Sequence, residues 1–461
     1  MKNFILIAFA CFATWQTHSQ QLQQLSFSEY LGYVKKYHPV VRQANLEISS
    51  AQAALMAARG AFDPKIEVDY DKKEFKGTEY YSLLNSSFKI PTWYGIELKA
   101  AFDNSEGIYV NPQNTTPNSG LTSVGINIPL AQGLFINTRI ADLRKAKVQL
   151  QLSEAERKLQ VTTAIYEASI AYFNWKKAYS EVELYSTYLN FASERYEGIR
   201  KLIQAGDKPA IDSIEAGITL KNRRLTLSDA QLKLAKARLE LSNYLWLDNV
   251  PMELSEDMVP EDAVEASVTD ALGLNTAMEA QSALTNHPKL LALEGKVNIL
   301  EIERRYKANL LLPQLNFSYN YLSEPSYFDN YRFEDYKVGV NFSFPLFLRK
   351  ERGALKLAKI KVQDGMLDLD LARLEIKNKY IAQQTEITSL AGQREIADDL
   401  VKDYTSMLQS EERLFSFGES SLFLINSREN NVVSARLSQI ALQNRYLTAN
   451  AELFRILSNP D

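Results

Sequence analysis

The chain has 461 residues, of which 46% are hydrophobic and 23% charged, and its formal net charge at pH 7 is only -4. This balance argues against a nucleic-acid-binding protein, which needs an excess of Lys and Arg, and no basic run with interleaved aromatic residues occurs. The hydrophobic fraction is normal for a folded chain, so extensive disorder is not expected.

The first 19 residues show the pattern of a secretory signal peptide. One basic residue, Lys2, precedes the apolar run Phe4–Ala13, and the predicted cleavage site follows Ser19. This run is shorter than the roughly 20 residues that a membrane-spanning helix needs. The only cysteine, Cys11, lies inside it, and bulky Phe9 argues against lipid attachment there. We therefore predict an exported mature chain that has no disulfide and no thiolate metal site.

Residues 20–250 form the first of two predicted repeats. Two helices separated by Pro39 come first, and after Pro64 the apolar residues recur at every second position, which predicts a strand. Strands are expected over about 64–130, and the last of them ends at Pro129. No run of 18 apolar residues follows residue 20, so a membrane crossing would have to use strands. Two further strand-like stretches, which either cross a membrane with the others or form an external excursion, are Tyr81–Ile90 and Tyr94–Phe102.

A pair of long amphipathic helices is predicted over about 139–247, with the turn between them at Gly206 and Pro209. In the second helix two sets of apolar residues each recur every seven positions, two residues out of phase with each other. At roughly 100° per residue the sets lie about 160° apart around the helix axis. A helix that is apolar on two nearly opposite sides is expected where neighbours flank it on both sides, as in the wall of a tube. The two sets are Leu220, Leu227, Leu234 and Leu241, and Ile218, Leu225, Leu232, Leu239 and Trp246.

Residues 251–275 are predicted to be an acidic connector in an equatorial region, and residues 276–461 then repeat the plan of the first part. The pair His38-Pro39 recurs as His287-Pro288, at a shift of 249 residues. Pro313 follows the next helix at the same shift from its counterpart in the first repeat. Internal repetition of this size indicates a duplicated unit of helix, strands and helical hairpin.

The second repeat has its own strands and its own hairpin. The strands are expected over about 313–346, where Pro313 precedes the first and Pro345 follows the last. The helical hairpin is expected over about 350–457, and its turn lies at Gly418. Arms of about 40 to 60 residues would reach roughly 60 to 90 Å at 1.5 Å per residue, which is longer than a globular domain.

The order and duplication of these short motifs resembles the TolC-like outer-membrane efflux protein family, whose members are also called outer membrane factors. The resemblance covers nearly the whole mature chain, although each motif is only two or three residues long. The motifs are the strand ends Ile128-Pro129-Leu130 and Phe344-Pro345-Leu346, the transitions from helix to strand at Pro64 and Pro313, and the glycine turns at Gly206 and Gly418.

This resemblance implies an α+β membrane protein that assembles as a homotrimer. Each protomer would give four strands, or more, to a trimeric outer-membrane β-barrel in contact with lipid, and its coiled-coil hairpins would form a periplasmic α-barrel. The implied partners are a periplasmic adaptor (membrane fusion) protein and an inner-membrane transporter. The implied function is that of the exit channel of a tripartite efflux or type I secretion system, which conducts solutes passively to the exterior.

In this family the periplasmic end of the tube is closed by the hairpins around the glycine turns. The resemblance makes Asp212 and Glu215 candidates for a carboxylate ring at the pore, and Phe415 a candidate closing residue. The matching positions of the second repeat are Leu424 and Ser427, so only the first repeat supports the ring. The predicted turns at the periplasmic tip contain Gly206, Pro209, Gly418 and Ser420.

Motifs of known enzyme classes are missing from the sequence. We find no nucleophile elbow, no His-Glu-x-x-His, no glycine-rich phosphate loop and no Cys/His pair, so we predict no enzymatic activity, no cofactor and no metal site. His38 and His287 both precede proline and are interpreted as structural. Aromatic residues of the strands are candidates for a membrane-interface girdle, namely Tyr70, Tyr319, Tyr321, Phe342 and Phe344.

A second hypothesis belongs to a different functional class. A periplasmic coiled-coil adaptor or scaffold protein without a pore would also have a signal peptide and long helical hairpins. It gives no reason for two groups of alternating strands that each end at Pro-Leu. The sequence does not identify a cargo for the channel hypothesis.

Overall fold

The computed structural model describes residues 23–274, 284, 286–327, 332–458 and 460. The predicted signal peptide, residues 1–19, lies outside the described residues. The chain divides into two compact units, each built from three stretches that are far apart in the sequence. Of the described residues, the first unit takes those within 1–38, 165–275 and 386–451, and the second takes those within 39–164, 276–385 and 452–461.

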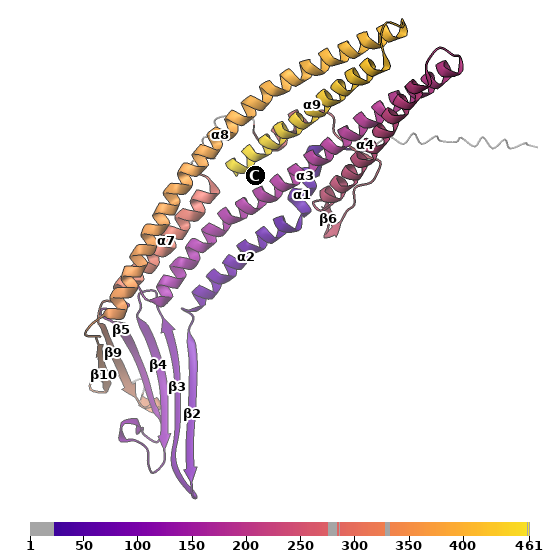
Figure 1. Ribbon diagram of the computed structural model, residues 1–461. Helices are drawn as coiled ribbons and strands as arrows, with labels where there is room; N and C mark the ends of the chain where they lie inside the picture. Colours follow the sequence, from indigo (N-terminus) through magenta and orange to yellow (C-terminus); the bar gives the residue numbers. More distant parts are fainter. Residues whose placement is uncertain (1–22, 275–283, 285, 328–331, 459, 461) are drawn as a thin grey trace, which may run out of the picture. The chain divides into compact units, whose positions relative to one another are not determined.

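The second unit contains the large sheet and the helices that lead into it (Figure 1). Its elements are α2 (Pro39–Gly60), β2 (Lys65–Phe75), β3 (Thr78–Pro91), β4 (Glu97–Glu106), η1 (Pro112–Asn114), β5 (Leu121–Pro129), α7 (Pro288–Asn309), β9 (Gln314–Ser323), η2 (Pro325–Tyr327) and β10 (Tyr336–Ser343). The first unit contains β1 (Gln23–Leu25), α1 (Phe27–Tyr37), α4 (Ala210–Ser242), β6 (Trp246–Leu247), β7 (Val250–Pro251), β8 (Met258–Pro260) and α5 (Val264–Ala271). Three long helices have residues in both units, α3 (Thr138–Gln204), α8 (Arg349–Ser416) and α9 (Leu422–Leu457).

The large sheet has six strands in the order β10-β9-β5-β4-β3-β2, and all neighbours are antiparallel. Strands of both repeats therefore share one sheet, because β5 of the first pairs with β9 of the second. The stretches Tyr81–Ile90 and Tyr94–Phe102, which the sequence left open between membrane strands and an external excursion, fall in β3 and β4 of this sheet. The sheet therefore has six strands, in agreement with the four or more that the resemblance implied. At the two ends of the sheet, β2 and β10 each have one neighbour among the described strands.

The strand predicted over Tyr94–Phe102 begins later than expected, at Glu97. Thr92 donates hydrogen bonds from its backbone N–H and its side-chain Oγ1 to the carbonyl oxygen of Ile96, both at 2.8 Å. Gly95 adopts a positive φ of 73°, which glycine tolerates without a steric cost. A tight turn therefore occupies residues that alternate like a strand in the sequence.

Proline marks the ends of the strands in both repeats. Pro64 and Pro313 directly precede β2 and β9, and Pro129 is the last residue of β5. Pro345 lies two residues beyond the end of β10. Proline has no backbone N–H to donate, so it fits at the end of a ladder and not inside it.

Local capping explains where several helices begin. Asn137 precedes α3, and its side-chain Oδ1 accepts a hydrogen bond of 2.9 Å from the backbone N–H of Ile140. Ser26 caps α1 in the same way through the N–H of Glu29, at 3.2 Å. Among the helices of the described residues, none contains a segment that combines the length and the apolar character needed to cross a membrane.

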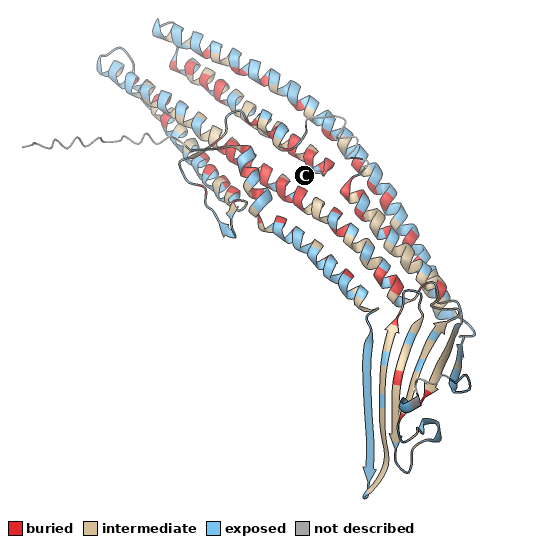
Figure 2. Cartoon of the chain, turned by 180° about the vertical axis from the view of Figure 1, so that it is seen from behind, coloured by how far each residue is buried: buried red, intermediate tan, exposed pale blue. Residues whose placement is uncertain are grey.

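The core of the first unit is an aromatic cluster in which α1 packs against α3. Trp175, Tyr172, Phe173, Phe27 and Tyr30 are all fully buried, and their neighbouring ring centroids lie 5.2 to 6.3 Å apart. Figure 2 shows buried residues concentrated along α3, whereas β2 is exposed over its whole length. The first of the two long helices predicted to be amphipathic thus contributes its apolar side to the core of this unit.

The described part of the acidic segment, residues 251–274, is attached to this cluster by specific hydrogen bonds. The Tyr172 hydroxyl donates to the carbonyl oxygen of Leu25 at 2.7 Å and accepts from the N–H of Glu261 at 3.1 Å. Buried Lys176 donates to the carbonyl oxygens of Glu261 and Asp262, at 2.5 and 2.8 Å. Strand β8 in this segment also pairs in parallel with β1. The segment is therefore an ordered part of the first unit.

His287 is buried at the start of α7, where it joins the ends of two helices. Its Nδ1 accepts a 3.0 Å hydrogen bond from the N–H of Lys289, and its Nε2 lies 2.8 Å from the carbonyl oxygen of Ile456 in α9. This pattern requires a neutral ring with the proton on Nε2. Burial lowers the pKa of His287 below its ordinary value, and nearby Lys289 acts in the same direction.

We expect acid to destabilise this contact. Because the pKa of His287 is lower in the folded chain, the unfolded chain binds more protons below about pH 6.5. The stabilisation is complete above that pH and decreases as the pH falls towards the pKa of the folded state. The midpoint of thermal unfolding should be lower at pH 5 than at pH 7.5. His287→Asn retains a side-chain acceptor for the cap but does not titrate, so its midpoint should change less with pH, and an equal change would contradict the assignment.

Candidate functional site

The six-stranded sheet has one apolar and one polar face. Successive residues of a strand point to opposite faces, and residues paired across strands share a face. One register row therefore crosses the whole sheet on the apolar face, and several of its side chains are exposed to solvent. Such a contiguous apolar surface marks contact with a membrane or a partner. The row consists of Ile66, Phe88, Ala100, Val124, Tyr321 and Tyr336.

The aromatic residues proposed for a girdle follow the same alternation. The register places Tyr70, Tyr319, Tyr321 and Phe342 on the apolar face, whereas Phe344 lies just beyond the end of β10. On the other face the rows contain mainly charged, amide and hydroxyl side chains. The sheet can therefore separate an apolar environment from an aqueous one.

Both helical hairpins turn through the same backbone motif. At the first turn the backbone N–H of Gly206 donates to the carbonyl oxygen of Ile203. The backbone N–H of Asp207 donates to the carbonyl oxygen of Leu202, and both distances are 3.0 Å. At the second turn Gly418 and Glu419 form the equivalent bonds to Phe415 and Leu414, also at 3.0 Å. These are the two bonds of a Schellman motif, in which glycine supplies the left-handed residue. The values of φ are 89° at Gly206 and 80° at Gly418.

The other predicted turn residues take part in ending or starting helices. Pro209 is the residue before α4 and has an extended backbone. Ser420 donates a 2.5 Å hydrogen bond from its hydroxyl to Oε1 of Glu411. Asp212 lies in the first turn of α4, where a negative charge interacts favourably with the helix dipole.

The structure brings Glu215 and Phe415 into contacts between the two hairpins. The Glu215 carboxylate accepts a 3.1 Å hydrogen bond from Nδ2 of Asn426 on α9. Phe415 is half-buried and packs against the cluster of Ile199, Ala216 and Leu422, with Nζ of Lys208 5.1 Å from the ring centre. The neighbouring Phe417 is 73% exposed. The resemblance made both residues candidates for the pore or gate, and their contacts here lie between the hairpins of one chain.

A buried ion group near the turns was not predicted from the sequence. Glu429 of α9 is only 1% exposed and lies between two arginines of the first hairpin. Its Oε2 lies 2.8 Å from Nη1 of Arg195, and its Oε1 lies 3.0 Å from Nη2 of Arg223. Arg223 also donates to Oδ1 of Asn430 at 2.8 Å. Because an unpaired buried charge is costly, this group makes α3 and α4 depend on α9.

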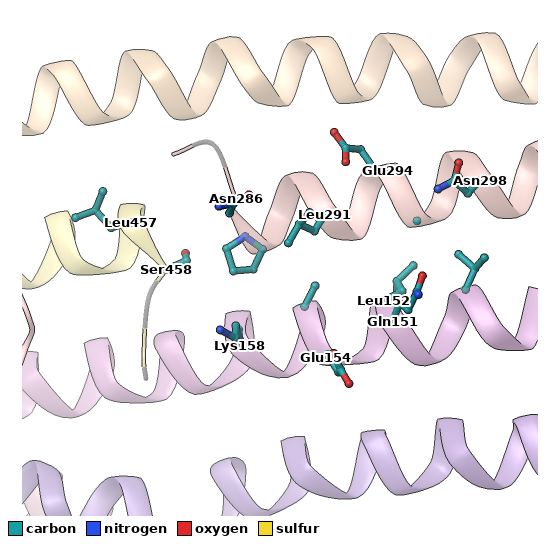
Figure 3. Close-up of a pocket in the computed structure, with 14 residues that line it drawn as sticks. Gln151, Leu152, Glu154, Lys158, Asn286, Leu291, Glu294, Asn298, Leu457 and Ser458 are labelled. Carbon is teal, nitrogen blue, oxygen red and sulfur yellow. The ribbon is translucent and has the colours of Figure 1, made fainter. Parts of the chain in front are cut away.

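A cavity of about 550 Å³ lies in the second unit, where α3, α7 and the end of α9 meet. Figure 3 shows Leu152, Leu291 and Leu457 around it, together with Glu154 and Lys158. The described residues that line the cavity include neither a histidine nor a cysteine. They offer a mixed polar and apolar surface and no pair of a nucleophile with an imidazole base.

Most of the chain matches one protein-family model. The family model described as "Outer membrane efflux protein" matches residues 34–245 and 280–459. No curated protein is significantly similar in sequence.

Several solved structures share the fold. The Campylobacter jejuni CmeC outer membrane channel has a TM-score of 0.65 at 12% identity, over 94% of this chain and 85% of that one. The Neisseria gonorrhoeae MtrE outer membrane channel, in its open state, has a TM-score of 0.66 at 13% identity, over 94% of this chain and 89% of that one. The Vibrio cholerae outer membrane protein VceC has a TM-score of 0.64 at 12% identity, over 93% of this chain and 95% of that one. At these identities the likeness establishes a common fold.

Proposed function

The chain belongs to the outer membrane efflux protein family, and from this premise we propose that it is the exit channel of a tripartite efflux or type I secretion system. Three copies would enclose one conduit, with the sheet in the outer membrane and the helices in the periplasm. An inner-membrane transporter and a periplasmic adaptor would deliver the solute, which then leaves passively. The observation on which the proposal depends most is the sheet with one apolar and one polar face, because it provides both a lipid contact and an aqueous lining.

Helix α4 supports assembly from several copies. Of its two apolar sides, the one with Leu220, Leu234 and Leu241 is buried within the chain. The other side stays largely exposed, and Leu225 at its centre is 72% exposed. Since a soluble surface rarely leaves such a seam uncovered, a helix of a second copy is its natural partner. The residues of the exposed side are Ile211, Ile218, Leu225, Leu232 and Leu239.

The contacts around the turns support a gate at the periplasmic tip. Glu215 and Phe415 connect the hairpins of one chain, and the buried Glu429 group connects them more strongly. We assign these residues to holding the hairpins together, and the exposed Phe417 to closing the passage. Opening would then require that the hairpins separate near Gly206 and Gly418.

The adaptor hypothesis gains no support from these observations. A helical adaptor or scaffold has no use for a six-stranded sheet with an exposed apolar face. The family match and the shared fold with outer membrane channels also favour the channel. Fractionation separates the two hypotheses, since the channel should be found in the outer membrane and the adaptor in the soluble or inner-membrane fraction.

Disulfide cross-linking tests whether sheets of separate copies join edge to edge. The only native cysteine, Cys11, lies in the predicted signal peptide, so introduced cysteines have no competitor in the mature chain. One cysteine in β2, at Ile66 or Val68, would be combined with one in β10, at Val338 or Val340. We expect oxidation to yield a ladder that ends at three copies. Ala100→Cys in the central strand β4 serves as the control and should stay monomeric, and the proposal fails if every edge pair behaves like this control.

A further inference from the structure

One register row on the polar face contains lysine on four of the six strands. Lys65 pairs with Lys89, and Lys89 pairs with Lys99. The row continues through Gly125 and Asn320 to Lys337 of β10. Like charges directly opposite in a sheet repel each other, so packing of the sheet does not explain this arrangement.

The two strands between Lys99 and Lys337 keep the row polar and add no charge. A Cβ atom at Gly125 would lie 2.2 Å from Oδ1 of Asn320, which shows that the amide of Asn320 lies over the glycine on this face. The row is therefore continuous across β5 and β9. At this level the polar face has four positive charges and no negative one.

Acidic residues occupy other levels of the same face. The next row away from the helices contains Glu67, which forms an ion pair with Lys89. The row after it contains Asp69 and Asp103. On the helix side of the lysines, Glu97 lies 3.7 Å from Arg139 of α3, which balances its charge.

Three of the four lysines have no carboxylate of the described residues within ion-pair distance, although Glu67 and Asp103 of the neighbouring rows interact with them at longer range. Within the described part of the chain, Lys65, Lys99 and Lys337 form no ion pair. Levels on one face are separated by two residues, or about 7 Å, which is just within the screening length at physiological ionic strength, so neighbouring rows still act on each other. The lysine row is therefore a level of four positive charges that borders acidic rows on the side away from the helices.

We propose that Lys65, Lys89, Lys99 and Lys337 form a basic belt that favours the passage of anionic solutes. The inference rests on the proposed channel, in which the polar faces of several copies would surround one lumen. Charges of one sign in a narrow, low-dielectric passage raise the local concentration of opposite ions. The belt lies at the end of the sheet nearest the helices, so a solute from the periplasm meets it before the aspartates. Carboxylate, phosphate or sulfonate groups are the chemistry that a ring of ammonium groups attracts.

The test is the reversal potential of the reconstituted protein across a planar bilayer in a potassium chloride gradient. The triple variant Lys65→Gln, Lys99→Gln, Lys337→Gln should lower the chloride-to-potassium permeability ratio by roughly threefold to tenfold relative to wild type. The variant with arginine at the same three positions keeps the charge and should keep the ratio. Both variants should retain the single-channel conductance steps that show an intact pore.

Lys72→Gln is the matched control, because Lys72 belongs to the same strand but lies on the apolar face, where it pairs with Glu79 at 2.9 Å. It should leave the permeability ratio unchanged. The belt is wrong if the triple glutamine variant conducts with the wild-type ratio or becomes more selective for anions. Absence of any conductance by the wild-type protein would instead overturn the proposed channel, and the belt with it.

Discussion

Replacing Glu429 with glutamine should loosen the contact between the two helical hairpins and increase the conductance of the channel. The change removes the carboxylate that lies between Arg195 and Arg223, so that buried Arg223 loses its ion-pair partner and Arg195 keeps only the half-exposed Glu412. Breaking a buried ion group in this way costs about 3 to 5 kcal/mol. We expect faster amide hydrogen exchange in the part of α9 around Glu429, and larger or more frequent conductance steps in single-channel recordings.

The control for this prediction is Glu412→Gln in α8. Glu412 also faces Arg195, at 3.8 Å, but about half of its side chain is exposed. A solvent-exposed ion pair of this kind contributes less than about 1 kcal/mol to the stability of the folded chain. The variant should therefore resemble wild type in exchange and conductance. If Glu429→Gln also leaves hydrogen exchange and conductance at the wild-type level, the buried ion group does not hold the hairpins together.

Replacing Trp175 with alanine should cost about 3 to 5 kcal/mol of unfolding free energy, the range for truncating a large buried aromatic residue. Trp175 is completely buried at the centre of the aromatic cluster, and its ring lies edge-on to Tyr172 at 5.5 Å. Tyr172 in turn connects β1 and the segment 251–275 to α3 through its hydroxyl. The loss should therefore appear as a lower denaturant midpoint and as faster exchange of the amides in α1 and α5.

Trp175→Phe distinguishes packing from hydrogen bonding at this site. The indole Nε1 of Trp175 is buried without a hydrogen-bond partner among the described residues. Phenylalanine loses some apolar contact but also removes this unsatisfied donor, so the two effects partly cancel. We expect a loss of about 1 kcal/mol or less. A loss as large as that of Trp175→Ala would mean that the indole N–H is essential and that the packing account is wrong.

Much of the architecture could be predicted because short, local signals determine it. Glycine at the two turns is required by positive φ, so Gly206 and Gly418 locate the ends of the helices from sequence alone. Proline at 64, 129 and 313 marks strand boundaries because it cannot donate to the ladder. The two apolar sides of α4 likewise follow from the heptad spacing, and the structure shows one of them buried and the other exposed.

Features that depend on long-range pairing could not be predicted in this way. The lysine row exists only because Lys65, Lys89, Lys99 and Lys337 fall into one register, and a shift of one residue would send a strand's side chains to the other face. Glu429 has polar neighbours in the sequence, Arg428 and Asn430, and nothing in that pattern reveals that it is buried.

Other details of single elements are determined by strand pairing, by a local hydrogen-bonded turn or by packing against another hairpin. The resemblance implied four strands or more, and the sequence left the place of Tyr81–Ile90 and Tyr94–Phe102 open. Pairing with β2 and β5 places both stretches in the sheet. Tyr94 alternates like a strand residue but lies in a turn that the backbone of Thr92 and Ile96 closes. The side chain of Phe415 points toward residues of the other hairpin, and aligning the two repeats gives no information about that contact.

Ion conduction by the purified protein alone tests the account most directly. Extracted from the outer membrane with detergent and added to a planar bilayer without any partner, the protein should produce discrete steps of current, because apolar sheet faces and exposed helix seams join copies of this chain around a water-filled path. A protein that leaves the bilayer insulating and runs as a single soluble chain would show that its helices and sheet are complete without other copies.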